Sequence, residues 1–327
     1  MQQSDIKLGI LSLSSFAQRT IIPTLLGGKT LLKLYAIASR NQEKANEAAQ
    51  KYGCIGFSSY DALIEDKSID AVYMPLPNSL HFQYIKAALN NGKHVLCEKS
   101  LGINPKEVNE LCHLAEKQNL VLMENFQFRF HPQLQMIKDI IKSGKLGELR
   151  CMRSSFGFPP FGDAENIRYQ KELGGGALLD TGAYPVKITQ EFLGRELEVK
   201  ASNLNTSKPF NVDIWGGAYI KQKNGELFSE IAFGFDHFYQ CSIEFWGSKG
   251  KLFTNRIFTA HPEYQPDAIL ETNDGKEIIS LPKGNHFELM LNHFTSLINN
   301  EVSRKDEYHQ NKVQAELLDQ IRIKSTQ

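Results

Sequence analysis

The first 124 residues alternate between stretches with the spacing of buried strands and stretches with the spacing of amphipathic helices. Strand-like runs occur near residues 6–11, 31–39, 69–77, 93–99 and 120–126, and helical runs occur at 41–53, 79–92 and 104–119. Alternation through short connections indicates parallel strands, because each helix returns the chain across the sheet by a right-handed crossover. This pattern predicts an α/β domain over residues 1–124, built on a doubly wound parallel sheet.

The pattern changes from residue 125 onward. Several strand-like runs between about 196 and 281 are separated by Asn-Gly, Gly-Ser or Asp-Gly turns, without helices between them. Such runs indicate a mostly antiparallel sheet. The predicted remainder is a helix at 132–148, a strand near 149–158, and helices at 285–300 and about 308–324. We therefore expect an α+β domain over residues 125–327 with a large open sheet.

The composition is that of a globular protein without a strong electric field. Apolar residues make up 41% of the 327 residues, and 37 Lys and Arg balance 37 Asp and Glu. A balanced charge gives no attraction for nucleic acid or for an anionic membrane. No apolar run reaches the roughly 18 residues of a spanning helix, and no leader pattern opens the sequence. We expect a cytoplasmic protein with no nucleic-acid or membrane partner.

The five cysteines are scattered and form no C-x-x-C pair, so their spacing fits neither a zinc site nor a redox motif. We expect no metal and reduced thiols, as is usual in the cytoplasm.

The N-terminal strand runs through a tight turn into a helix, where a dinucleotide-binding fold carries its G-x-G-x-x-G/A fingerprint. Here both turn glycines are serines, Ser12 and Ser14, and Ala17 stands at the third position after Ser15 and Phe16. A serine Cβ hinders the close approach of a pyrophosphate, but its hydroxyl can donate to a phosphate oxygen beside the helix N-terminus. We expect these five residues to bind the cofactor pyrophosphate.

The end of the second strand determines the cofactor. A carboxylate there would bind the ribose 2′-hydroxyl of NAD, whereas this chain has Ser39 and Arg40, with Lys44 one turn into the next helix. Arg40 can hold a 2′-phosphate through two donors. The alternative is that Arg40 is a solvated helix-start residue. We expect NADP(H), with NAD(H) possible.

Later motifs carry a family resemblance. GKHVLCEKSLGINPKEVNEL places Glu98-Lys99 at a strand end, and GGGALLDTGAYPV (174–186) pairs Asp180 with Tyr184. With PNSLH (77–81), NFQFRFHPQ (125–133) and NIRY (166–169), they resemble the glucose–fructose oxidoreductase / inositol dehydrogenase / MocA (Gfo/Idh/MocA) superfamily over essentially the whole chain. The similarity is greatest to the branch of dimeric dihydrodiol dehydrogenases, aldose dehydrogenases and sugar-nucleotide ketoreductases.

The resemblance implies a Rossmann domain and the catalytic residues Lys99, Asp180 and Tyr184. In that family a strand-end lysine touches the nicotinamide ribose and the reacting oxygen, and the Asp and Tyr line the substrate side. Alternative roles are a surface lysine for Lys99, a helix N-cap for Asp180 and a packing aromatic for Tyr184. The family's Glu-Lys-Pro is Glu-Lys-Ser here, which loosens the backbone restriction at Lys99.

Further site residues are expected around these motifs. The cofactor candidates are Pro75, Asn78, His81 and Glu98, and the substrate candidates beside Lys99, Asp180 and Tyr184 are Arg129, His131 and Arg168. For Arg129, His131 and Arg168, structural ion pairs are equally plausible. Phe156, Phe158 and Phe161 are expected in the core rather than in a stacking platform.

The predicted function is an NADP(H)-dependent oxidoreductase acting on a secondary alcohol or ketone of a sugar, nucleotide sugar or related cyclic polyol. The alternative is a catalytically silent ligand sensor or co-repressor of the same superfamily, which the missing glycines favour and the retained Lys99, Asp180 and Tyr184 oppose. An open sheet needs a cover on one face, and the family pairs there, so we expect a homodimer or homotetramer.

Overall fold

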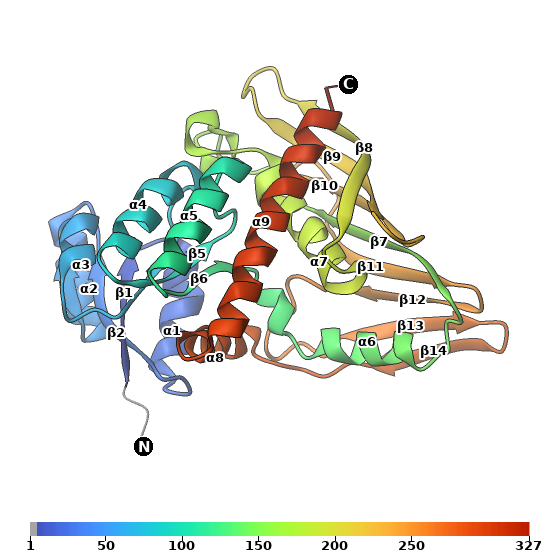
Figure 1. Cartoon of the computed structure of the whole chain (residues 1–327), viewed down its shortest axis with the longest axis horizontal. Helices are drawn as coiled ribbons and strands as arrows, with labels where there is room; N and C mark the ends of the chain where they lie inside the picture. Colours follow the sequence, from blue (N-terminus) through green and yellow to red (C-terminus); the bar gives the residue numbers. More distant parts are fainter. Residues whose placement is uncertain (1–4, 327) are drawn as a thin grey trace. The chain divides into compact units, whose positions relative to one another are not determined.

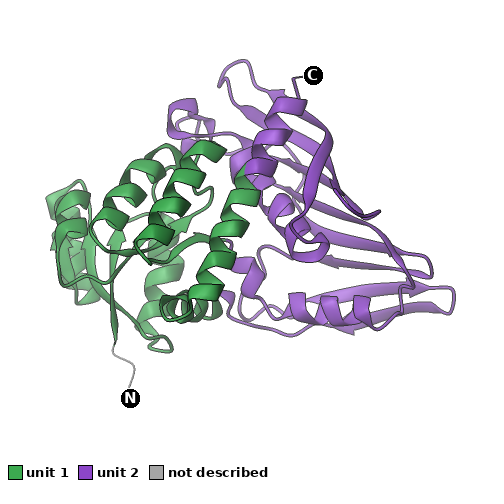
Figure 2. Cartoon of the chain, viewed as in Figure 1, with its two compact units in different colours: residues 1–125, 287–315 green, residues 126–286, 316–327 purple. Residues whose placement is uncertain are grey.

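The computed structural model describes residues 5–326 and divides into two compact units (Figures 1 and 2). Unit 1 contains the chain up to Asn125 together with Phe287–Ala315. Unit 2 contains Phe126–His286 and the chain from Glu316 onward. The predicted second domain, residues 125–327, includes residues 287–315, whereas in the structure these residues belong to unit 1.

Unit 1 is built on a six-stranded sheet in the order β3-β2-β1-β4-β5-β6, with every pair parallel. This confirms the predicted doubly wound sheet. Its strands are β1 (Ile6–Leu11), β2 (Leu32–Ala38), β3 (Ile55–Phe57), β4 (Ala71–Met74), β5 (His94–Glu98) and β6 (Leu122–Asn125). The sequence analysis missed β3, which is only three residues long.

The helices of unit 1 begin and end largely where their capping residues predict. Asn41 and Asn104 each accept a hydrogen bond from the backbone N–H three residues on, at 3.0 Å, and Gly53 ends its helix with a φ of 68°. The helix predicted at 79–92 begins one residue earlier, at Asn78. The helices are a π-helical turn (Ala17–Ile21) leading into α1 (Ile22–Leu26), then α2 (Gln42–Tyr52), α3 (Tyr60–Glu65), α4 (Asn78–Asn90) and α5 (Pro105–Lys117).

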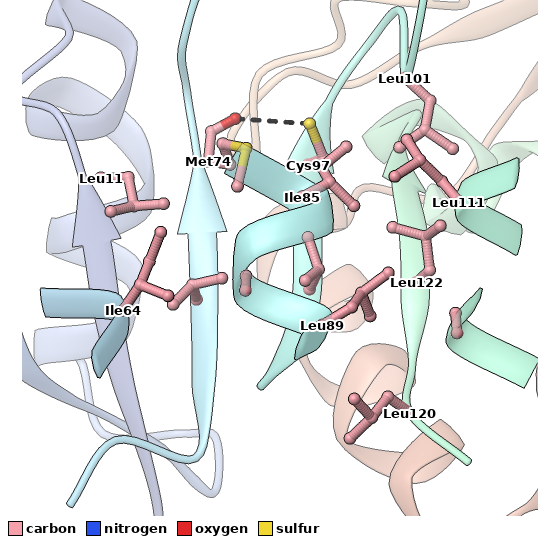
Figure 3. Packing of buried hydrophobic residues seen from close by; sticks show 14 of the residues in the cluster. Leu11, Ile64, Met74, Ile85, Leu89, Cys97, Leu101, Leu111, Leu120 and Leu122 are labelled. Carbon is pink, nitrogen blue, oxygen red and sulfur yellow. Dashed lines mark hydrogen bonds between the residues drawn. The ribbon is translucent and has the colours of Figure 1, made fainter. Parts of the chain in front are cut away.

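Apolar side chains of β1, β4, β5 and β6 form one buried cluster with the helices that cover them (Figure 3). Leu11, Met74, Cys97 and Leu122 are fully buried there, and the Cys97 thiol points to the carbonyl oxygen of Met74 at 3.8 Å. Burying a side chain of this size contributes roughly 1.5–3 kcal/mol. The strand ends that carry the site therefore rest on a packed core.

Two helices near the end of the sequence, α8 (His286–Ile298) and α9 (Glu301–Lys324), also contribute to unit 1. On α9, the Tyr308 hydroxyl donates to the carbonyl oxygen of Leu120, and Asn311 Nδ2 donates to that of Leu122 at 3.1 Å. These bonds fall on β6, the edge strand, and on the residues leading into it. The sequence pattern predicts a helix only from about 308, because the buried face over the first half of α9 is largely polar and conceals the periodicity.

Unit 2 is built on an eight-stranded sheet in the order β14-β13-β12-β11-β7-β10-β9-β8. Only the β7–β10 pair is parallel, so the mostly antiparallel prediction is confirmed. The strands are β7 (Leu149–Gly157), β8 (Leu197–Thr206), β9 (Asp213–Gln222), β10 (Phe228–Gly234), β11 (Gln240–Gly247), β12 (Gly250–Asn255), β13 (Asp267–Thr272) and β14 (Gly275–Ser280).

Unit 2 contains α6 (Gln133–Lys142), α7 (Ala183–Leu193) and the last part of α9, from Glu316 onward. A π-helical turn at Leu178–Gly182 precedes α7. Short 3₁₀ segments lie at Gln127–Phe130, Ile167–Tyr169 and Lys171–Leu173. The turn and α7 together carry the Asp-Tyr motif.

Candidate active site

The turn between β1 and the first helix keeps a glycine-type backbone although it contains serines. Ser12 has a φ of 131°, a value that residues with a Cβ rarely adopt. Ser14 begins the helix: its Oγ accepts from the Ala17 N–H at 3.1 Å, and its carbonyl accepts from the Gln18 N–H at 3.1 Å. The turn therefore has the shape of the glycine fingerprint, with one serine acting as the helix cap.

The residues present here fit a phosphorylated dinucleotide. The first-turn N–H groups of a helix have no partner within the helix and favour an anion. At the end of β2, Ser39 Oγ accepts from the Asn41 N–H at 3.2 Å, and the side chains of Arg40 and Lys44 are exposed. Two positively charged side chains lie here, and no carboxylate occupies the strand end. This arrangement suits the 2′-phosphate of NADP(H).

The strand-end motif is fixed by a carboxylate between three strands. Glu98 Oε1 accepts from the Tyr73 hydroxyl of β4 and from Asn125 Nδ2 of β6, both at 2.6 Å. The pKa of Glu98 is raised above its ordinary value, because the effect of burial exceeds that of the two hydrogen bonds and of the Lys99 charge, which lower it. Lys99 follows directly and is partly buried, at the carboxyl edge of the parallel strands where such sheets bind ligands. The Lys99–Ser100 peptide bond is cis.

The candidates that follow β4, two of them in the first turn of α4, support this turn. Asn78 Oδ1 accepts from the Ser100 N–H at 3.2 Å. His81 is fully buried, with Nδ1 2.7 Å from the carbonyl oxygen of Ser100 and Nε2 2.9 Å from that of Leu76. Pro75 is buried as well. The expected contact of His81 with the cofactor is not supported, because both ring nitrogens face backbone carbonyls.

In unit 2, three predicted residues come together. Asp180 lies in the π-helical turn and Tyr184 in the first turn of α7, and Arg168 Nε reaches Asp180 Oδ2 at 2.6 Å. The pKa of Arg168 is raised above its ordinary value. Burial lowers it, but the charge and hydrogen bond of Asp180, together with the nearby Tyr184, raise it by more. Asp180 lies inside the helical segment and is not its N-cap.

The glycines before Asp180 allow the backbone conformation that leads into this helical segment. A Cβ on Gly175 would lie 2.5 Å from the carbonyl oxygen of Arg168, and Gly176 has a φ of 114°. Asp213 of β9, which the sequence analysis missed, accepts from the Leu178 N–H at 2.6 Å. No local pattern marks Asp213, because it meets this turn only through the tertiary fold.

Aromatic side chains surround Tyr184. The ring centroids of Phe126, Phe128, Phe156 and Phe258 lie between 5.1 and 5.8 Å from that of Tyr184. Phe158 contacts both Phe156 and Phe161. The three phenylalanines expected in the core thus pack on one another. The tyrosine ring makes edge contacts with Phe126 and Phe156 and tilted contacts with Phe128 and Phe258.

Arg129 and His131 are engaged within unit 2. Arg129 Nε pairs with Glu191 Oε1 of α7 at 3.0 Å, and its side chain is 8% exposed. His131 is buried, and its Nδ1 accepts from the Gln133 N–H at 3.2 Å. Burial lowers the pKa of His131 to about 4. Arg129 thus forms the structural ion pair given as its alternative role, whereas the contact of His131 is with a backbone N–H, and a substrate role for either residue stays a prediction.

Across residues 5–326, the His, Cys, Asp and Glu side chains form no group of three or more that could hold a metal ion. In the same range, no helix combines the length and apolar character needed to cross a membrane.

A doubly wound parallel sheet that ends in a lysine at its ligand-binding edge is typical of dinucleotide-binding enzymes. Residues 6–126 match the model of the oxidoreductase family with an NAD-binding Rossmann fold, and residues 134–253 match the GFO/IDH/MocA C-terminal domain. The chain belongs to the Gfo/Idh/MocA family. It is an NAD(P)-dependent oxidoreductase acting on the keto or CH–OH group of a sugar.

The relatives found include nucleotide-sugar reductases. The chain is 35% identical over 319 residues to a dTDP-3,4-didehydro-2,6-dideoxy-alpha-D-glucose 3-reductase from Actinomadura kijaniata, covering 98% of this chain and 95% of that protein. It is 31% identical to D-xylose 1-dehydrogenase (NADP(+)) 2 of Haloferax volcanii, over 83% of this chain and 82% of that protein. A crystal structure of KijD10, a 3-ketoreductase from Actinomadura kijaniata in complex with NADP and TDP-benzene, matches 98% of both chains with a TM-score of 0.92 and 34% identity.

Proposed function

We propose that this protein reduces the 3-keto group of a deoxysugar carried on a nucleoside diphosphate, with NADPH as reductant. The observation that carries the proposal is the match over 98% of the chain to a 3-ketoreductase in complex with NADP and TDP-benzene. Arg40 and Lys44, exposed at the end of β2 and the start of α2, support the preference for the phosphorylated cofactor.

In this proposal the chain's own residues hold the cofactor and manage the proton. The Ser12–Ala17 turn would hold the pyrophosphate of the cofactor and Arg40 its 2′-phosphate, and the bound nicotinamide would supply the hydride. Tyr184 donates its phenolic proton to the oxygen that becomes an alkoxide as the ketone is reduced. Lys99 donates a hydrogen bond to the same oxygen and lowers the energy of the developing charge.

Asp180 acts in this proposal as an anchor for the substrate side. Its carboxylate is already held by Arg168, so one oxygen is fixed in place. A fixed carboxylate can accept a hydrogen bond from a sugar hydroxyl without losing much side-chain freedom. The Arg168–Asp180 pair therefore favours a role in orienting the sugar over a role as the proton donor.

The direct test is turnover with the keto sugar. The protein is mixed with NADPH and enzymatically prepared dTDP-3,4-didehydro-2,6-dideoxy-α-D-glucose, and the loss of absorbance of NADPH is compared with the product found by mass spectrometry. We expect one NADPH consumed per sugar reduced, and D-xylose with NADP⁺ serves as the competing substrate. Binding of NADPH without turnover of either sugar would favour the sensor and overturn the proposal.

We also propose a homodimer or homotetramer formed through the open face of the unit 2 sheet. The strand register places Arg153, Glu230, Glu244 and Trp246 on one face, where Arg153 pairs with both glutamates and stacks on Trp246 at 4.0 Å. Trp246 is 41% exposed, although large aromatic side chains are usually covered. Sedimentation should show an oligomer that Trp246→Glu dissociates, while Phe238→Glu, an exposed aromatic on the loop after β10, leaves it intact.

The proposed location is the cytoplasm. All five cysteines are free thiols, and Cys97, Cys112 and Cys241 are buried. Unpaired thiols are typical of reducing compartments. Microscopy of a fluorescent fusion in the source cell would test this.

A further inference from the structure

The backbone that carries Lys99 is held on both sides by side chains from neighbouring elements. On one side Glu98 is bound by Tyr73 and Asn125. On the other side Ser100 is bound through its N–H to Asn78 and through its carbonyl to His81. Directly after it, the Leu101 N–H donates to Glu124 Oε1 at 2.8 Å. Lys99 therefore lies in the middle of a clamped segment.

The clamp at Ser100 uses a group that the family's usual residue lacks. A proline at this position would have no N–H, so it could not donate to Asn78. Here the N–H is present and accepted at 3.2 Å. The hydrogen bond thus offers a restraint at the position where the proline ring is missing.

His81 joins the two loops at the carboxyl edge of the sheet. It is fully buried, and its two nitrogens face the carbonyl oxygens of Ser100, after β5, and Leu76, after β4. A neutral imidazole has one N–H and can donate to only one of them. We assign the proton to Nδ1, because its distance to Ser100 is the shorter, 2.7 Å against 2.9 Å.

We propose that His81 is a positioning residue that acts through the Ser100 carbonyl to hold Lys99 in register with the reacting oxygen. The role of Lys99 in this statement rests on the proposed function. A misplacement of about 1 Å in a catalytic group can cost about 100-fold in rate, so a single buried hydrogen bond in the adjoining peptide can control kcat.

Two amide substitutions separate the two hydrogen bonds of the ring. In His81→Asn, the side-chain amide nitrogen takes the place of Nδ1 and can donate to Ser100. In His81→Gln, the amide nitrogen takes the place of Nε2 and can donate only to Leu76. His81→Leu removes both donors and serves as the matched apolar control. Melting temperatures and NADPH affinity are measured for all three, so that kcat is compared among folded, cofactor-saturated proteins.

We expect His81→Asn to keep kcat within about threefold, and His81→Gln and His81→Leu to lower it about 10- to 100-fold. In a Lys99→Ala background, His81→Gln should cause no further loss, because the two residues act on the same step. Equal loss in the Asn and Gln variants, or additive losses with Lys99→Ala, would overturn the proposal.

A second readout needs no substrate. The rate of acetylation of Lys99 by acetic anhydride, followed by mass spectrometry of the free protein, reports the position and surroundings of its amine. We expect His81→Asn to match the unaltered protein and His81→Gln to change the rate several-fold. An unchanged rate in the Gln variant would refute the positioning role, whereas absence of sugar turnover in the unaltered protein would refute only the proposed function.

Discussion

Replacing Ser12 by glycine should stabilise unit 1. Ser12 holds a φ of 131°, and a residue with a Cβ in such a conformation costs about 1–3 kcal/mol. Glycine removes that cost but loses about 0.5–1 kcal/mol more backbone freedom on folding. The expected net gain is about 1 kcal/mol, which corresponds to a rise in melting temperature of about 2–4 °C for a unit of this size.

The assay is differential scanning calorimetry of the protein without cofactor, because the two units can unfold separately and a single fitted transition would mix them. Ser12→Ala is the matched control: it removes the hydroxyl but keeps the Cβ that causes the strain. We expect the alanine variant to show no such rise. A glycine variant that melts at or below the temperature of the unaltered protein, or an alanine variant that gains as much, would refute the reasoning.

Three further predictions follow. Arg40→Ala should reduce the preference for NADPH over NADH by about tenfold or more, because charge-assisted hydrogen bonds to phosphate contribute about 1.5–3 kcal/mol. Fluorescence titration with both cofactors tests this, and Arg19→Ala, at another exposed arginine, is the control. Tyr184→Phe should lower kcat by about 10²–10⁴-fold and leave NADPH affinity nearly unchanged, because the aromatic packing is kept; a loss confined to KM would remove the tyrosine from proton transfer. Stability should fall as the pH drops from about 6.5 towards 4, because burial lowers the pKa of His131 to about 4 while the unfolded chain takes up its proton near the ordinary value of 6.5. The contribution of His131 is fully present above the unfolded value, so His131→Gln should reduce the dependence of melting temperature on pH. Part of the dependence should remain, because burial also lowers the pKa of His81, His94 and His286, and an identical pH dependence in both proteins would contradict the prediction.

The parallel sheet of unit 1 was predictable because its strands are short apolar runs bounded by clear caps and turns. The features of unit 1 that sequence reasoning missed lack such signals: β3 has three residues, α3 has six, and the buried face over the first half of α9 is largely polar. A strand of three residues is too short to show the two-residue alternation of apolar and polar side chains. At α9, hydrogen bonds to the edge strand replace apolar contacts, so a search for hydrophobic periodicity starts the helix too late.

For the site, motif spacing placed Lys99, Asp180 and Tyr184 on the elements where they are found. Their partners were not predictable, because they come from distant positions: Asp213 is 35 residues from Leu178, and Glu191 is 62 residues from Arg129. His81 was expected at the cofactor because its motif lies at the carboxyl edge of the sheet. A buried orientation toward Ser100 depends on how the start of α4 packs against the loop after β5, and the sequence pattern of neither segment contains that information.

The hydrogen bonds between α9 and the edge of the first sheet also have a consequence for synthesis. Leu120 and Leu122 receive their partners from residues 188 and 189 positions further along the chain. A ribosome that has finished the six strands of unit 1 has not yet made the helices that cover the edge strand. The nascent sheet must wait, with β6 open to mispairing, until nearly the whole of unit 2 has emerged. In this protein the last helices to be translated complete the first unit to be started.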